Sequence, residues 1–79
     1  MNVYETSDLG LASALCCLGY PIMGLDRHDS RRVVFCFDVK QEGVEEAVKA
    51  YWDGSLRLSP AALFTHQKML KQRIYGDRS

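Results

Sequence analysis

The chain has 79 residues, and its ten Lys and Arg balance ten Asp and Glu, which leaves a formal net charge of zero. This length supports one small domain with a single core, and the composition, 47% apolar and 25% charged, is that of an ordinary globular protein. The balanced charge argues against a general DNA coat. The sequence has neither a run of about 18 apolar residues nor the basic start of a signal peptide, so we expect a cytoplasmic protein that does not enter a membrane.

The chain opens with a predicted strand followed by a helix. Residues 2–5 form a short strand, and apolar residues then recur at helical spacing over residues 7–18. Ser7 or Thr6 is the expected N-cap of this helix, and Gly19 is the expected residue just past its end. Because the helix carries few charges, we expect it to be buried on most of its circumference.

A hairpin follows the first helix. Residues 21–25 start a strand with Pro21, residues 26–31 are polar and form the loop, and residues 32–38 form the clearest strand of the chain. Alternation divides this last strand into two apolar faces, Val33, Phe35 and Phe37 on one side and Val34 and Cys36 on the other. The strand is therefore either central or paired on one face with a partner.

The second half of the chain predicts two helices. Residues 41–52 carry an apolar stripe at helical spacing, and Gly54 closes this helix. Residues 55–58 alternate, which is enough for a short strand only. Ser59 as N-cap and the proline after it start a last helix over residues 60–75.

These elements predict an α+β domain of two layers, with a mostly antiparallel sheet packed by helices, in the order β-α-β-β-α-(β)-α. If residues 55–58 pair in the sheet, the first six elements match a ferredoxin-like order. If they do not pair, a three-stranded sheet under three helices remains. The sequence leaves this choice open, and the chain forms a single domain over residues 1–79 in either case.

Four motifs are spread along the chain. They are Tyr4-x-Thr6-x-Asp8-Leu9 before an Ala/Leu-rich helix that stops at Gly19, Phe35-x-Phe37, Tyr51-Trp52-x-Gly54, and Lys71-x-Arg73-Ile74-Tyr75. In these motifs the chain resembles a domain of unknown function found in small bacterial and phage-encoded proteins. The resemblance spans nearly the whole chain and implies a compact stand-alone domain, with no established activity, cofactor or catalytic residue.

The residues of catalytic or metal chemistry form no motif. Cys16, Cys17 and Cys36 are odd in number, and their spacing fits neither a disulfide framework nor zinc, even with His28 and His66. The one approach of a nucleophile to a base is Cys36 with His28 across the hairpin. No phosphate-binding glycine loop and no G-x-S-x-G turn is present. We therefore expect no enzyme, no metal and no cofactor.

Two surfaces remain as candidates for binding. The last helix carries Lys68, Lys71 and Arg73, which are candidate nucleic-acid contacts, although cations near a helix C-terminus also complement its dipole. Trp52 is a candidate interface anchor or a core residue.

The other candidate surface is the second face of the sheet. Val34 and Cys36 would be exposed there, unless the last helix crosses over and covers them. An uncovered apolar face is commonly paired with a second copy or another protein. The sequence therefore predicts a non-enzymatic protein-interaction module, as a homodimer or with an unidentified protein partner. The alternative is an accessory nucleic-acid-binding protein that uses the last helix.

Overall fold

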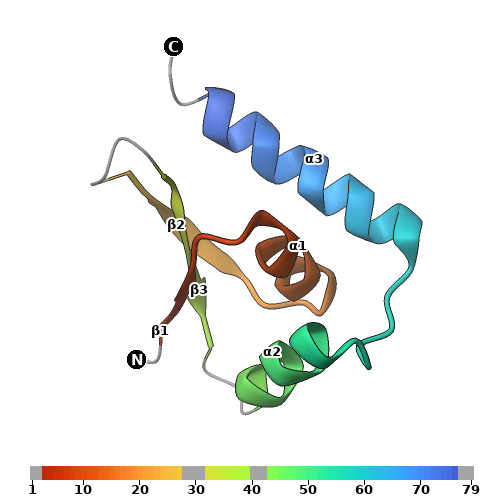
Figure 1. The fold of residues 1–79 in the computed structure, drawn as a ribbon. Coiled ribbons are helices and arrows are strands. Elements are labelled where there is room, and N and C mark those ends of the chain that lie inside the picture. The colour runs from red at the N-terminus through yellow and green to blue at the C-terminus, as the bar shows by residue number, and fades with distance from the viewer. Residues whose placement is uncertain (1–2, 28–31, 40–42, 77–79) are drawn as a thin grey trace.

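A computed structural model describes residues 3–27, 32–39 and 43–76 of the chain. Three strands form one antiparallel sheet in the order β1-β3-β2, so that β3 is central, and the helices gather on one side of it (Figure 1). This confirms the α+β class and the antiparallel sheet. In chain order the elements are β1 (Val3–Thr6), α1 (Leu9–Cys17), β2 (Ile22–Asp26), β3 (Val34–Asp38), α2 (Val44–Asp53) and α3 (Pro60–Gly76).

Residues 55–58, for which the sequence leaves open whether they pair in the sheet, form an irregular connection between α2 and α3. Gly54 takes a left-handed conformation with φ of 81°, which turns the chain at the end of α2. The N–H groups of Ser55 and Leu56 then both donate to the carbonyl oxygen of Ala50, at 3.0 and 3.1 Å. Because these two N–H groups donate to the end of α2, they are not available to pair with a strand. The three-stranded sheet is therefore the alternative observed.

The start of α1 is set by Asp8, and not by Ser7 or Thr6 as expected. The Asp8 carboxylate accepts a hydrogen bond of 2.8 Å from the N–H of Leu11. Thr6 still belongs to β1, where it pairs with Phe35, and its hydroxyl oxygen accepts from the N–H of Asp8 at 3.1 Å. The helix therefore begins later than its apolar spacing indicates.

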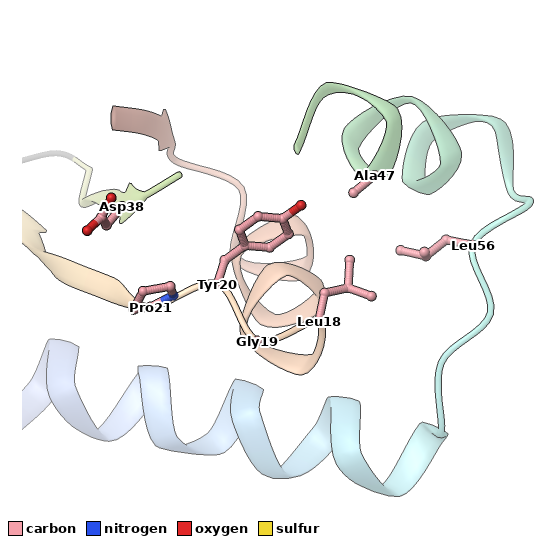
Figure 2. Close-up of a pocket in the computed structure, with 7 residues that line it drawn as sticks. All are labelled: Leu18, Gly19, Tyr20, Pro21, Asp38, Ala47 and Leu56. Atoms are coloured by element: carbon pink, nitrogen blue, oxygen red, sulfur yellow. The ribbon is translucent and has the colours of Figure 1, made fainter. Parts of the chain in front are cut away.

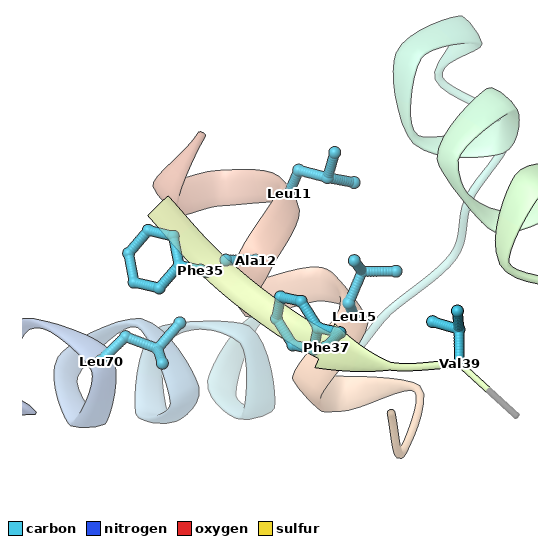
Figure 3. Packing of buried hydrophobic residues seen from close by; sticks show 7 residues of the cluster. All are labelled: Leu11, Ala12, Leu15, Phe35, Phe37, Val39 and Leu70. Carbon is cyan, nitrogen blue, oxygen red and sulfur yellow. The ribbon is translucent and has the colours of Figure 1, made fainter. Parts of the chain in front are cut away.

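The core forms where α1 lies against the inner face of the sheet (Figure 3). Residues 11–15 of α1 are buried in succession, which confirms that this helix is enclosed on most of its circumference. Phe35 and Phe37 of β3 are 2% and 0% exposed, and Leu70 of α3 is 3% exposed. The buried apolar cluster consists of Leu11, Ala12, Leu15, Phe35, Phe37, Val39 and Leu70.

Helix α3 packs along α1 and not over the second face of the sheet. Its start follows the sequence prediction, since the Ser59 hydroxyl accepts from the N–H of Ala62 at 3.4 Å. At its other end, the guanidinium of Arg27 donates to the carbonyl oxygens of Arg73 and Ile74. A residue just past β2 thus joins the sheet to the last turn of α3, and the expectation that α3 could cover the second face is wrong.

Candidate functional site

The first candidate site is the outer sheet face, defined here as the side of the sheet opposite α1. Alternation from the buried Phe35 and Phe37 places Val34 and Cys36 on this face, as the sequence predicts, and both are partly buried. Val3 and Met23 are the more exposed apolar side chains of the flanking strands, at 46% and 49%.

The strand register places acidic residues beside this apolar group. Glu5 of β1 lies opposite Cys36, and Asp26 of β2 lies opposite Val34. Between them, Gly24 is the β2 partner of Cys36, next to an irregularity of the register that accommodates Met23. On the outer sheet face, the central strand therefore presents Val34 and Cys36 followed by Asp38 at its end, and each flanking strand adds a carboxylate.

The Cys36 thiol is held in its protonated form by this arrangement. Its Sγ donates to Oε2 of Glu5 at 3.6 Å. Burial, the hydrogen bond and charge of Glu5, and the charge of Asp26 all raise the pKa of Cys36. A nucleophilic cysteine needs the opposite shift. His28, which the sequence places across the hairpin, lies outside the described residues.

The other two cysteines lie on α1. Cys16 and Cys17 are free thiols and partly buried, and Cys16 packs against the core cluster. Burial raises the pKa of both; the neighbouring Cys17 raises that of Cys16 further and Arg73 opposes the change. Within residues 3–27, 32–39 and 43–76, no three His, Cys, Asp or Glu side chains gather as a metal site requires.

Trp52 lies away from the outer sheet face. It is 62% exposed on α2, and its ring meets that of Tyr51 edge to face with centroids 5.0 Å apart. Because α2 belongs to the helical side of the molecule, the structure does not join Trp52 to Val34 and Cys36 in one surface (Figure 1). Of the three predicted interface residues, Val34 and Cys36 therefore share one surface, and Trp52 lies exposed on another.

The basic residues of α3 lie on two different flanks of the helix. Lys68, Lys71 and Arg73 are all exposed. At about 100° per residue, Lys68 and Lys71 lie roughly 60° apart around the helix, whereas Arg73 is at least about 140° from either. The effect of Arg73 on the pKa of Cys16 agrees with this, since it places the guanidinium on the flank toward α1.

Two aromatic residues share the flank of the lysines, and sequence reasoning missed them. Phe64 is 66% exposed and Tyr75 is 64% exposed. Phe64, Lys68, Lys71 and Tyr75 follow the spacing i, i+4, i+7, i+11, which keeps them on one side of a helix. We call these four residues the aromatic–lysine stripe. The spacing is visible in the sequence, but the exposure of the two rings depends on how α3 packs.

A pocket of about 500 Å³ lies where the end of α1 meets α2 and the connection to α3 (Figure 2). Leu18 and Leu56 point toward each other across it, and the Tyr20 ring lies toward Ala47. Its polar side chains are one phenol and one carboxylate, which provide no nucleophile with a base. No motif in the sequence indicates the pocket, because its lining residues come from separate segments: Leu18, Gly19, Tyr20, Pro21, Asp38, Ala47 and Leu56.

Comparisons with known proteins do not assign a function to these surfaces. The chain matches no protein family model, no curated protein and no solved structure. The resemblance to a domain of unknown function therefore stays a prediction based on the four quoted motifs. None of the described helices combines the length and the apolar content that crossing a bilayer requires.

Proposed function

We propose that this protein is a non-enzymatic interaction module that pairs with a second copy of itself through the outer sheet face. The observation that supports this is the pair of apolar side chains Val34 and Cys36 on the central strand, together with the exposed Val3 and Met23 on the flanking strands. A single apolar patch serves both subunits when two copies meet around a two-fold axis. An apolar centre with charged groups toward its border is also the usual anatomy of an interface.

The size of the face indicates a weak dimer. Three strands of four or five residues span about 14 by 17 Å at ordinary strand spacing and rise. This footprint of roughly 240 Å² on each copy lies below what stable, specific protein interfaces bury, so the pairing belongs to the weak and transient contacts. We therefore expect association in the upper micromolar range, as is typical of a transient contact.

The carboxylates of the face set how the association depends on salt. Pairing would bring Glu5 and Asp26 of one copy toward the same residues of the other, and like charges repel at short range. Dissolved salt screens such repulsion. Dimer formation should therefore strengthen as the salt concentration rises.

Two other properties belong to this proposal. The protein is taken to have no catalytic role, which the raised pKa of Cys36 supports because it keeps the thiol from acting as a nucleophile. A cytoplasmic location is supported by the three free thiols, which suit a reducing compartment.

The test is sedimentation velocity of the full chain up to about 1 mM, with two matched variants. Met23→Asp places a charge on the outer sheet face, and Met69→Asp places the same charge on α3 at nearly equal exposure, 49% against 53%. Met23→Asp and Val34→Asp should remain monomeric and folded by circular dichroism. Met69→Asp should associate like the wild type.

Three results would contradict the proposal. The wild type could remain monomeric across the whole concentration range, or Met23→Asp and Met69→Asp could weaken association equally. Unfolding of Val34→Asp together with a folded, associating Met23→Asp would place the outer sheet face inside the monomer, since a buried charge is the change that unfolds a chain.

A further inference from the structure

The aromatic–lysine stripe is a second surface, and the outer sheet face does not use it. Figure 1 shows α3 along the outside of the molecule, on the helical side of the sheet. Leu70 is 3% exposed, and Ile74 packs against the core cluster, so the apolar side of α3 is occupied. Phe64 and Tyr75 are nevertheless about two-thirds exposed on the adjoining flank. Packing in the core therefore does not account for the position of Phe64, and the Tyr75 ring is exposed to the same extent.

We propose that the aromatic–lysine stripe binds single-stranded nucleic acid. The two rings lie about 16 Å apart along the helix axis at 1.5 Å per residue, and the two lysines lie between them. An aromatic ring can stack on any base, while a lysine attracts the phosphate backbone, and this combination is the usual basis of single-strand binding without sequence preference.

The charge of α3 favours a polyanion. Its residues 60–76 include three cations and no Asp or Glu, although the whole chain has a net charge of zero. The acidic side chains of Glu5 and Asp26 lie on the outer sheet face, away from this helix. A nucleic acid that approaches α3 therefore meets locally positive potential without an intervening carboxylate of the same helix.

The same geometry favours a single strand over a duplex or a membrane. Bases in a duplex are stacked on each other, so Phe64 and Tyr75 would add little to duplex binding. A helix that lies on a membrane inserts a broad apolar face, and on α3 that face is the one that carries Leu70 and packs in the core. Two separate rings beside lysines fit unstacked bases better than lipid chains.

The test is fluorescence anisotropy with a labelled oligothymidylate of about 20 nucleotides, which exceeds one helix-sized site. We expect weak binding by the full chain, with a dissociation constant on the order of 100 μM at low salt. Two phosphate contacts to a single strand predict a slope of roughly −1.4 for the logarithm of the association constant against that of the salt concentration. This dependence has the opposite sign to that of self-association.

Substitutions on each flank of α3 test the two flanks separately. Replacing Lys68 and Lys71 together by Ala should weaken binding roughly tenfold and flatten the salt dependence. Phe64→Ala should weaken binding about tenfold and leave the salt dependence unchanged, because it removes stacking without removing charge. Arg73→Ala and Met69→Ala change the opposite flank and should each leave the affinity within about twofold of the wild type. All these positions are exposed, and circular dichroism verifies the fold.

The proposal is overturned if no anisotropy change occurs at low salt, or if the two flanks contribute equally. It is also overturned if a duplex of the same length binds as tightly, or if vesicles with anionic lipid bind the chain and the oligonucleotide does not. Met23→Asp keeps the stripe intact, so its affinity for the oligonucleotide should equal that of the wild type. The inference therefore stands or fails independently of the proposed dimer.

Discussion

Gly10 lies in the first turn of α1, where a larger residue would meet a neighbour. A Cβ atom at this position would clash with the hydroxyl group of Tyr51 and lie 3.2 Å from Oδ1 of Asp8. Burial and the charge of Asp8 raise the pKa of Tyr51, which therefore keeps its proton where it approaches the capped helix end. Gly10 thus allows α2 to place a phenol against α1.

Gly10→Ala tests this contact. The replacement normally gains up to about 1 kcal/mol in a helix, but the clash with Tyr51 costs about 1–3 kcal/mol. We expect the free energy of unfolding, measured by urea denaturation, to fall by about 1 kcal/mol. In a Tyr51→Phe background the clash is removed, so Gly10→Ala should instead raise it by about 0.5–1 kcal/mol. Equal effects in the two backgrounds would show that the phenol is not the obstacle.

The raised pKa of Cys36 predicts how its reactivity depends on pH. Because the folded environment disfavours the thiolate, alkylation by iodoacetamide should rise at a higher pH than for an unfolded cysteine. Glu5→Gln removes a negative charge and should move this rise to lower pH. Mass spectrometry of the peptide that contains Cys36 separates it from the α1 cysteines. A rise at lower pH than in the unfolded chain would contradict the prediction.

The same shift affects stability. The folded pKa of Cys36 lies above the unfolded one, so its protonated form contributes stability that is fully present below the unfolded pKa. That contribution is lost as the pH rises through the folded pKa.

At the scale of single elements, the sequence predicts most of the fold correctly. Five of the six elements follow from apolar periodicity and glycine positions, and α3 follows from Ser59 and Pro60. The sequence could not decide whether residues 55–58 pair in the sheet, because alternation over four residues does not reveal where the backbone donors are used. The Asp8 cap was missed because Thr6 and Ser7 are equally good caps, and only the extent of β1 decides between them.

Arg27 makes a contact that no local sequence pattern predicts. Its guanidinium reaches the carbonyl groups of residues 73 and 74, which are 46 and 47 positions away in the sequence. Those carbonyls belong to the last turn of α3, where a helix has unpaired acceptors and a negative dipole end. The packing of α3 along α1 places the last turn of α3 within reach of Arg27.

Arg27→Ala should therefore loosen the last turn of α3. Loss of a charged donor to helix carbonyls costs about 1–2 kcal/mol. Hydrogen exchange should become faster at the amides of Arg73, Ile74 and Tyr75 and remain unchanged in α1. Arg27→Lys keeps the charge and should give an intermediate result. The role of Arg27 would be refuted if the amides at the end of α3 exchanged at equal rates in the wild type, Arg27→Ala and Arg27→Lys.

At the scale of the whole molecule, the candidate sites were only partly predictable. The outer sheet face follows from alternation in β3, because that pattern is local. The separation of Trp52 from Val34 does not, since it depends on where α2 packs. The pocket near Tyr20 needs four separate segments of the chain to meet, and no motif in the sequence indicates it.

The net charge of zero also does not reveal that positive and negative side chains gather on different sides of the molecule. The cations of α3 and the carboxylates of the outer sheet face lie on different sides of the molecule. Opposite salt dependences for self-association and for binding to oligonucleotide are the measurable result. If both respond to salt with the same sign, one surface has been assigned incorrectly.

The most enclosed helix of this chain is synthesised before the helix that covers it. The enclosed helix is α1, and α3, along which it packs, is synthesised after it. Until Leu70 is available, a nascent chain exposes part of an apolar helix together with a sheet that is open on its other face. A chain shortened to end at Gly54 should bind the dye ANS and lack fixed near-ultraviolet circular dichroism. We therefore expect a chain that lacks α3 to aggregate more readily than the full chain, because it exposes apolar surface that Leu70 otherwise covers.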